Sequence, residues 1–257
     1  MIKRVANISL LLGIILLFVS ITIHISVFMQ LVAAFLLACG ITLLIFGVAR
    51  MRLSFFMHNI CRLPDTEKFI ALTFDDGPDK DSDELLDLLD RYNVKATFFC
   101  TGRNASMYPK TLQRIIASGH TVGSHTFNHH NFFPLSGFKG VYAEVRGGAV
   151  AIHNLIGKNP LLFRPPYGVT NPVIARAVKA CNLISIGWDI RSFDTTVKSS
   201  EIFLKKIIPR LKPGSILLLH DRVRITREVL PVILQEIEKR GLVPVTLEEG
   251  LKMKVYE

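Results

Sequence analysis

Two adjacent carboxylates close an apolar run near residue 75. The stretch IALTFDDGPD, residues 70–79, ends on Asp75 and Asp76, followed by a glycine and a proline. Carboxylates this close repel one another, so one of them resists ionisation unless a cation or a base-like role accounts for the pair. A divalent metal accounts for both, because its charge keeps them ionised and acidifies a bound water that a neighbouring base can deprotonate.

The segment SHTFNHH, residues 124–130, supplies nitrogen ligands for such a metal. His125 and His129 are four residues apart, and on one helical turn they share a face. Two imidazoles and a carboxylate suit a hydrolytic metal site that keeps positions open for water. Either Asp75 or Asp76 can be the third ligand, and the other is then placed to act as general base. The alternative is a surface histidine cluster without a metal.

A rigid loop is expected in FRPPYG, residues 163–168. Arg164 can hold a carboxylate in a bidentate grip. Tyr167 and Gly168 offer backbone N–H groups, one of which can receive a developing oxyanion. Taken alone, this motif predicts no more than a stiff turn.

The segment LLLHD, residues 217–221, ends an apolar run on a histidine. His220 can serve as general acid to a leaving amine, with Asp194 holding its ring and favouring the imidazolium. Leu218 and Trp188 suit the walls of a small apolar pocket, although a place in the core explains them almost as well.

The elements that must position these residues alternate regularly after residue 67. Apolar runs alternate with amphipathic helical patterns, which predicts an α/β fold with a mostly parallel sheet. About seven such units suit a closed or nearly closed (β/α) barrel, whose active site lies at the carboxyl ends of the strands. The expected strands are 69–74, 96–100, 121–125, 161–165, 183–188, 215–220 and 242–246, and the expected helices lie near 82–92, 107–118, 138–156, 171–181, 199–210 and 224–240.

The motifs TFDDG, HTFNH, RPPYG and LLLH occur in this order at predicted strand ends. The ordered set resembles the polysaccharide deacetylase family, the chitooligosaccharide deacetylase homology domain of carbohydrate esterase family four, over about 66–250. The resemblance implies a distorted (β/α) barrel and metal-dependent removal of an N-acyl group from an amino sugar. The metal is usually zinc, with cobalt, nickel or manganese also used. By position, the resemblance implies that Asp76, His125 and His129 bind the metal and that Asp75 is the general base, tethered by Arg164. It also implies that the Tyr167 N–H binds the oxyanion and that His220 is the general acid, oriented by Asp194. Trp188 and Leu218 would then shape the acyl pocket.

One motif departs from the family pattern. Many members carry a tryptophan, two spaced aspartates and a second tryptophan, whereas WDIRSFDTT, residues 188–196, has Arg191 in place of an aspartate and Thr195 in place of the second tryptophan. Asp194 still matches the orienting aspartate. The groove beside it is therefore expected to differ, which affects substrate identity more than chemistry.

The first 50 residues predict a membrane anchor. Residues 5–49 contain no Asp, Glu, Lys or Arg. This run is too long for one span of about 20 residues, so we expect two spans near 6–23 and 27–48 with a tight turn around His24. One long tilted signal-anchor helix is the alternative. The expected division is thus a transmembrane helical hairpin in 1–50, a connector in 51–67 and the deacetylase-like catalytic domain in 68–257.

Flanking charges predict the orientation of this anchor. Lys3 and Arg4 precede the first span, and Arg50 and Arg52 follow the second. The positive-inside rule then places both termini and the catalytic domain on the cytoplasmic face of the cell (inner) membrane. A cytoplasmic domain would meet a polyprenyl-phosphate-linked sugar, and an external one would meet an N-acylated glycan such as peptidoglycan. The net charge of +10 comes without a block of like charges, so it favours anionic lipid over nucleic acid.

Two other functions are weighed against the enzyme. A non-catalytic glycan-binding module with this fold should lack a metal ligand or the base, and all of them are present. A metal phosphoesterase should carry ligands for two ions, and one three-ligand set is found. The four cysteines show no metal-type or CxxC spacing, so they are expected to be single buried thiols.

Overall fold

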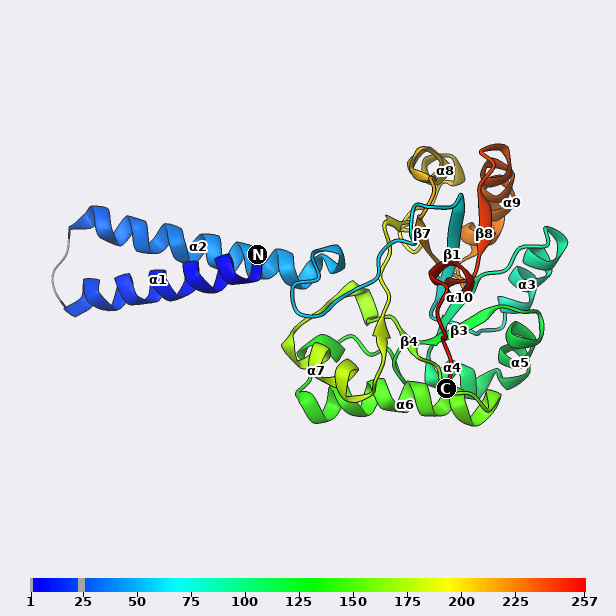
Figure 1. Cartoon of the computed structure of the whole chain (residues 1–257), viewed down its shortest axis with the longest axis horizontal. Coiled ribbons are helices and arrows are strands. Elements are labelled where there is room, and N and C mark those ends of the chain that lie inside the picture. The colour runs from blue at the N-terminus through cyan, green and yellow to red at the C-terminus, as the bar shows by residue number, and fades with distance from the viewer. Residues whose placement is uncertain (1, 23–25) are drawn as a thin grey trace.

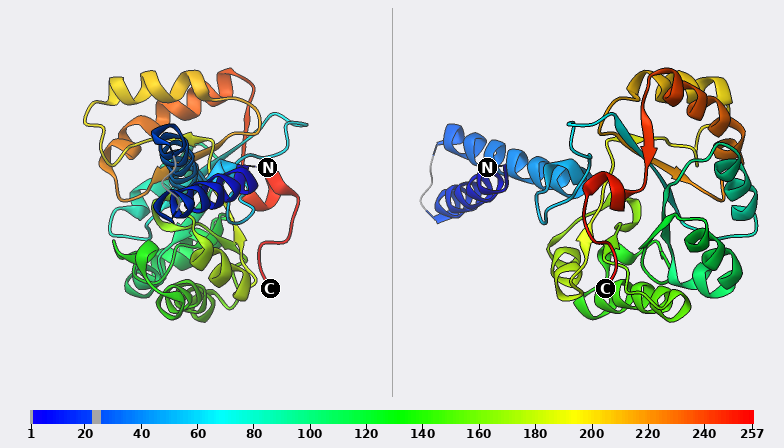
Figure 2. Two further views of the ribbon diagram at one scale, coloured as in Figure 1. Left: turned by 90° about the vertical axis from the view of Figure 1, so that its left-hand side faces the viewer. Right: turned by 45° about the vertical axis from the view of Figure 1, so that its right-hand side comes forward.

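The computed structural model describes residues 2–22 and 26–257. A hairpin of two long helices projects from an α/β domain that contains the rest of the described chain (Figure 1). The views in Figure 2 show the hairpin leaving the domain on one side, with the C-terminus on the domain surface. The predicted turn residue His24 lies outside the described residues.

The hairpin consists of α1 (Ile2–Thr22) and α2 (Val27–Ala49). Both helices are long and apolar enough to cross a membrane, with mean hydropathies of 2.0 and 2.7. They pack closely through small residues, because a Cβ atom on Gly13 or Gly40 would lie within 2.7 Å of a leucine side chain of the other helix. Their outer faces expose large apolar side chains such as Phe28 and Phe35, unlike a helix in a soluble core.

All strand pairings in the sheet are parallel. Seven strands follow the order β5-β4-β3-β2-β1-β7-β6, and β8 pairs with the start of β1. The two outer strands, β5 and β6, are joined by only four residues, 186–189, so the sheet curls into an incomplete barrel and the predicted fold class is confirmed. Within the described residues the strands are β1 (Phe69–Asp75), β2 (Thr97–Cys100), β3 (Thr121–Ser124), β4 (Leu162–Phe163), β5 (Ile184–Ser185), β6 (Ile190–Arg191), β7 (Ile216–His220) and β8 (Val243–Val245).

Helices surround the curled sheet, with α3 and α5 on one side, α6 and α7 below, and α8 and α9 above in Figure 1. Their apolar faces bury the largest core cluster against β1, β2 and β7, as amphipathic helices outside a parallel sheet must. The helices of this domain are α3 (Ser82–Arg91), α4 (Gly102–Met107), α5 (Pro109–Ala117), α6 (Phe138–Ile156), α7 (Pro172–Ala180), α8 (Ser200–Ile207), α9 (Arg224–Lys239) and α10 (Leu247–Leu251), with single 3-10 turns at Met51–Leu53, Phe133–Leu135, Pro166–Gly168 and Ile208–Arg210.

Two expected elements differ from the structure. The helix expected near 107–118 is α5, but a short helix that was not expected, α4, precedes it and ends at Met107, because Pro109 begins α5 and disfavours helical geometry at Tyr108. The strand expected over 183–188 is short, and the chain leaves the sheet before Trp188 and rejoins it at β6. This second difference turns Trp188 out of the ladder and toward the end of the barrel.

Candidate active site

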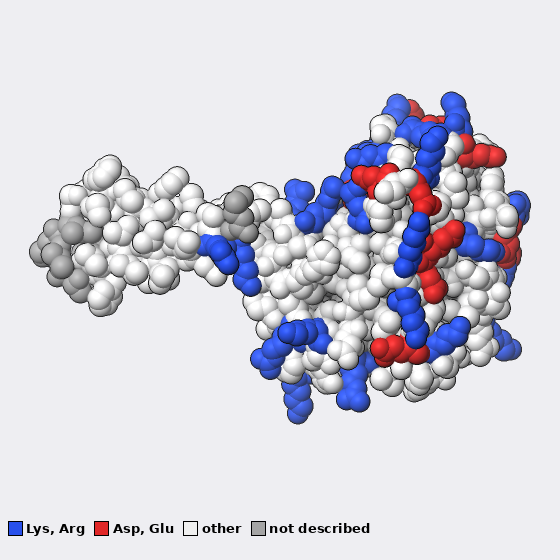
Figure 3. All heavy atoms as spheres, viewed as in Figure 1, with Lys and Arg blue, Asp and Glu red and all other residues white. Residues whose placement is uncertain are grey.

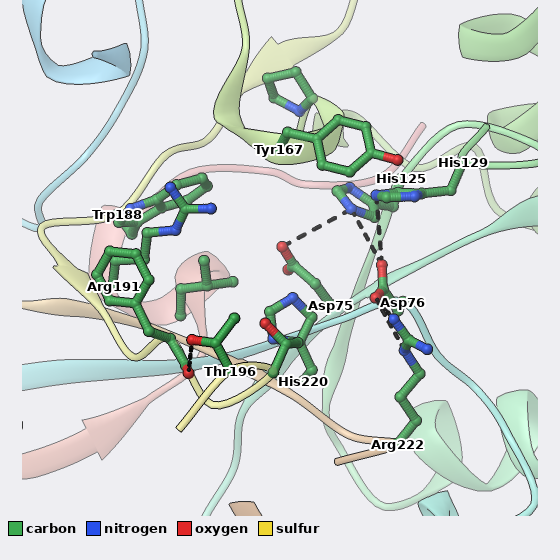
Figure 4. Close-up of a pocket in the computed structure, with 14 residues that line it drawn as sticks. Asp75, Asp76, His125, His129, Tyr167, Trp188, Arg191, Thr196, His220 and Arg222 are labelled. Atoms are coloured by element: carbon green, nitrogen blue, oxygen red, sulfur yellow. Dashed lines mark hydrogen bonds and ion pairs between the residues drawn. The ribbon is translucent and has the colours of Figure 1, made fainter. Parts of the chain in front are cut away.

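A pocket of about 250 Å³ opens at the carboxyl ends of the strands (Figure 4). Eight of the ten predicted site residues line it, and the other two, Arg164 and Asp194, lie behind lining residues and contact them. The lining residues are Asp75, Asp76, His125, His129, Pro165, Tyr167, Trp188, Arg191, Phe193, Thr195, Thr196, Leu218, His220 and Arg222.

The two carboxylates diverge where β1 ends. Asp75 is the last residue of the strand, and Asp76 adopts a left-handed backbone conformation with φ of 75°, which aspartate adopts more readily than most residues. Figure 4 shows Asp75 directed to the centre of the pocket and Asp76 toward two histidines. Gly77 must follow, because a Cβ atom there would lie 1.8 Å from a carboxylate oxygen of Asp221.

Asp75 is held by a fully buried arginine. The Nη1 atom of Arg164 lies 2.7 Å from Oδ1 of Asp75 and 2.8 Å from Oγ1 of Thr73. Its Nη2 atom donates to the carbonyl of Gly187, and the guanidinium lies 4.1 Å from the ring centre of Phe99. The guanidinium compensates the buried carboxylate and leaves its second oxygen directed at the pocket.

Asp76, His125 and His129 face one another across a gap that suits a metal ion. Both imidazole Nε2 atoms lie 3.6 Å from Oδ1 of Asp76, and the three ligand atoms all lie within 4.8 Å of one another. Ligands about 2.1 Å from a tetrahedral zinc are roughly 3.4 Å apart, so the set is close to the spacing that zinc requires. Among the described residues, buried Oδ1 of Asp76 has no hydrogen-bond partner. The residues present therefore fit the metal that the sequence predicts.

The electrostatics of this set favour ligation. Burial lowers the pKa of His125 to about 4, so its ring is neutral. A carbonyl can only accept, so His125 Nδ1–H donates to the backbone oxygen of Arg164 at 2.6 Å and Nε2 keeps its lone pair. Burial alone would raise the pKa of Asp76, but the imidazoles of His125, His129 and His220 and then the guanidinium of Arg222 bring it below its ordinary value.

The expected helical turn between the two histidines is wrong. Residues 125–130 form a loop, with left-handed conformations at Thr126 and His129. Asn128 ties this loop to α6 through two hydrogen bonds of 2.8 Å to the carboxylate of Glu144. The spacing of four residues therefore brings the rings to 4.8 Å apart by a loop held from outside, which the sequence pattern alone does not distinguish from a helix.

His220 stands across the pocket, paired with a buried carboxylate. Its Nδ1 atom lies 2.7 Å from Oδ1 of Asp194, and Oδ2 of Asp194 accepts from the His220 backbone N–H and from Thr226 Oγ1, each at 2.7 Å. Burial alone would lower the pKa of His220, but the hydrogen bond and charge of Asp194, followed by the charges of Asp75 and Asp76, raise it to about 9. His220 is therefore an imidazolium at neutral pH.

The pocket walls depend on a close contact between two loops. The turn Pro166–Gly168 puts Tyr167 at φ of 62°, and no acceptor for its backbone N–H is found in the described part of the chain. A Cβ atom on Gly168, whose φ is 69°, would lie 2.4 Å from the Trp188 ring. Only glycine permits this approach. Trp188 packs against a core cluster as well as lining the pocket. Leu218 is likewise a buried residue that lines the pocket.

Six lining residues are not among the predicted site residues, namely Pro165, Arg191, Phe193, Thr195, Thr196 and Arg222. Arg222 lies 3.0 Å from Oδ2 of Asp76, and its only sequence signal is its position two residues after His220. Phe193 and Thr196 enter the pocket from the segment that departs from the family pattern. Arg191 stands beside them, 4.8 Å from the ring centre of Phe193 and 5.7 Å from that of Trp188.

Comparison with known proteins gives a family for this geometry. The family model described as polysaccharide deacetylase matches residues 62–185. The peptidoglycan-N-acetylglucosamine deacetylase PgdA of Listeria monocytogenes is 34% identical over 193 residues, covering 74% of this chain and 41% of the relative. A peptidoglycan-N-acetylglucosamine deacetylase of Bacillus cereus is 33% identical over 199 residues, covering 75% of this chain and 92% of the relative.

A solved structure agrees. The crystal structure of the Bc1960 peptidoglycan N-acetylglucosamine deacetylase superposes with a TM-score of 0.70 at 28% identity, covering 77% of this chain and 94% of that one. The chain spans less than half of the Listeria relative, so the similarity concerns only part of that protein. It nevertheless spans nearly all of the Bacillus cereus relative. On these grounds, the chain belongs to the polysaccharide deacetylase family.

Proposed function

We propose that this protein is a metal-dependent N-deacylase that hydrolyses the N-acyl amide of an amino sugar. The observation that carries this proposal is the arrangement of three functions around one pocket: a metal set, a tethered carboxylate and a charged histidine. Family membership supports it, because the relatives compared above are named as deacetylases.

Asp76, His125 and His129 would hold one divalent ion, with zinc as our first choice and cobalt, nickel or manganese as alternatives. Such an ion supplies a Lewis acid and acidifies water. The neutral ring of His125 and the unpartnered oxygen of Asp76 are the features of this chain that prepare the site. Arg222 forms an ion pair with Asp76 on the solvent side and so partly compensates the charge of this carboxylate.

Asp75 would act as general base. Arg164 binds one of its oxygens, so the other oxygen points into the pocket in one orientation and can take a proton from an attacking water. The water oxygen then bonds to the acyl carbon, and the carbonyl oxygen becomes an oxyanion that the Tyr167 backbone N–H can bind.

His220 would complete the reaction as general acid. When the carbon–nitrogen bond breaks, the imidazolium transfers its proton to the departing nitrogen, which leaves a free amine and a carboxylic acid. Asp194 keeps His220 charged and oriented for this transfer. Trp188 and Leu218 leave room for a small acyl group such as acetyl.

The hairpin is proposed to span the membrane. Its apolar surface is exposed to the outside of the molecule, and its ends carry Lys3, Arg4, Arg50 and Arg52, which favours both ends on the cytoplasmic side. The substrate is then an N-acetylated sugar within reach of that membrane. The relatives named above act on peptidoglycan by their names, and a lipid-linked amino sugar is the form that a cytoplasmic domain would meet.

Metal removal and one substitution test the enzymatic function. We expect chelation to abolish release of acetate from N-acetylglucosamine oligomers, and added zinc to restore it. Asp75→Asn should lower kcat by about 10²- to 10⁴-fold while metal content stays equal to that of the parent. Asp87→Asn on exposed α3 is the matched control and should be fully active. Tight oligomer binding without any acetate release would instead identify a glycan-binding module.

A reporter fused after Glu257 tests the topology. A reporter that is active only outside the cytoplasm should stay silent while the fusion is shown to be expressed. An active reporter would contradict the proposed orientation and direct the substrate search to external glycans.

A further inference from the structure

A second cavity adjoins the pocket on the side of the hairpin. It has a volume of about 430 Å³ and is lined by four arginines, Arg50, Arg52, Arg191 and Arg210, which we call the arginine groove. Trp188, Arg191 and Phe193 line both cavities, so the groove and the catalytic pocket share one wall.

The charge of the arginine groove is not neutralised from within. Among residues 2–22 and 26–257, no carboxylate lies at ion-pair distance from any of its four guanidinium groups. Asp189 also lines the groove, but its carboxylate is used by Arg62 at 2.6 Å and by the backbone N–H of Ile216 at 2.7 Å. Arg210 reaches only the backbone oxygen of Asp189. Four unpaired guanidiniums around one cavity suit a phosphate, which arginine binds through paired hydrogen bonds.

The groove has a defined height relative to the membrane, if the hairpin spans it as proposed. α2 has 23 residues and is therefore about 35 Å long, slightly more than the hydrocarbon core of a bilayer. Arg50 follows its last residue directly, which places the groove at the level of lipid headgroups. Figure 3 shows basic side chains where the hairpin meets the domain and on the nearby part of the hairpin, whereas the far part of the hairpin that the structure describes shows none.

Direct contacts fix the end of the hairpin relative to the catalytic pocket, so the position of the groove along the membrane normal also fixes that of the pocket. The backbone N–H of Thr170 donates to the carbonyl of Val48 at 3.1 Å, which ties the end of α2 to the loop that carries Tyr167. Met51, the next residue but one after α2, is buried, and its sulfur lies 3.4 Å from where a Cβ atom on Gly168 would be. The membrane anchor therefore positions the groove and the catalytic loop together.

We propose that the arginine groove binds the phosphate of a lipid-linked amino sugar while the sugar occupies the catalytic pocket. The lipid phosphate would lie at headgroup level, and the sugar attached to it would extend past Arg191 and Trp188 to the metal set. This assignment rests on the proposed function and names its substrate class: an isoprenoid or similar lipid joined through phosphate to an N-acylated amino sugar. Ordinary anionic headgroups offer the same phosphate chemistry, but they give no reason for the groove to share a wall with the pocket.

The test compares two substrates on the full chain in nanodiscs, with zinc restored. One is N-acetylglucosamine joined through phosphate to a short isoprenoid, and the other is the neutral glycoside of the same sugar and isoprenoid alcohol. Arg52→Gln and Arg210→Gln should each lower kcat/KM for the phosphate substrate about tenfold, since each removes one charge-assisted contact. Both should leave turnover of the neutral glycoside unchanged, and Arg91→Gln, an exposed arginine on α3, should leave both substrates unchanged.

The outcomes are distinguishable. Equal turnover of both substrates by the parent protein would overturn the phosphate site while leaving the deacylase intact. Equal losses on both substrates in the groove variants, together with weaker binding to phosphatidylglycerol vesicles, would assign the groove to bilayer headgroups instead. Hydrolysis of neither substrate by a protein that still releases acetate from N-acetylglucosamine oligomers would overturn the groove assignment alone. Failure on the oligomers as well would overturn the proposed function.

Discussion

His125 and His220, which lie on opposite sides of the pocket, have opposite protonation states at neutral pH. His125 is buried and His220 is partly buried, and this burial alone lowers the pKa of each. His125 nevertheless has a pKa of about 4 and His220 a pKa of about 9. The difference lies in the partner of Nδ1, which is the backbone carbonyl of Arg164 for His125 and the carboxylate of Asp194 for His220. A neutral partner leaves a metal ligand, whereas an ionised partner leaves an acid.

This contrast shows how one residue type can serve two roles within one pocket. A carbonyl orients a ring without charging it, and the ring nitrogen that faces the pocket keeps its lone pair. A carboxylate both orients the ring and stabilises the imidazolium, so the nitrogen that faces the pocket carries a proton. The hydrogen-bond partner of Nδ1 therefore determines whether the imidazole can bind a metal or donate a proton through Nε2.

The largest loss of activity is expected when the neutral imidazole of His125 is removed. His125→Gln should leave the protein without bound metal after gel filtration and lower turnover by about 10³-fold or more, because a Lewis acid contributes several kcal/mol to such a reaction. Metal content measured by atomic absorption checks this. His120→Gln replaces another buried histidine of lowered pKa outside the pocket and should retain metal. A metal-replete His125→Gln protein would contradict the proposed ligand set.

Replacing Asp194, the charged partner of His220, should shift the pH dependence of kcat. Below pH 6.5 the imidazolium of His220 favours the folded state, and this stabilisation is lost as the pH rises through about 9. The parent enzyme should accordingly lose kcat above about pH 9. Asp194→Asn should move this alkaline limb to or below pH 6.5 and lower kcat at pH 7.5 by about 10²-fold, with metal content unchanged. His220→Gln is the control and should show no such limb. An unshifted limb in Asp194→Asn would assign it to another group.

The sequence predicts the chemistry of this site better than its construction. The motifs at strand ends place Asp75, His125 and His220 at one edge of a parallel sheet, and the barrel brings them together as expected. The loop between the two histidines could not be predicted, because it depends on Glu144 from a helix later in the chain. The charge of each imidazole likewise depends on burial and on partners distant in sequence.

The segment around Arg191 shows the same limit at the substrate side. Its departure from the family pattern predicts a different groove but not its walls. Those walls also come from Arg50 and Arg52 at the end of the hairpin, far away in the sequence. The proximity of the N-terminal hairpin to the pocket therefore becomes visible only in three dimensions.

The smallest loss of activity is expected from Thr226, which contacts Asp194 and not the reacting groups. Thr226 Oγ1 donates to Oδ2 of Asp194, and this oxygen also accepts from the backbone N–H of His220. Thr226→Val removes the first contact and keeps the second, so Asp194 should stay ionised and oriented. We expect kcat to fall only about threefold to tenfold, as for the loss of one hydrogen bond to a charged group, with the alkaline limb shifted slightly to lower pH. Thr226→Ser, which keeps the hydroxyl, should restore both values. If Thr226→Val were as impaired as Asp194→Asn, the charge on His220 would depend on the whole hydrogen-bond chain rather than on the carboxylate alone.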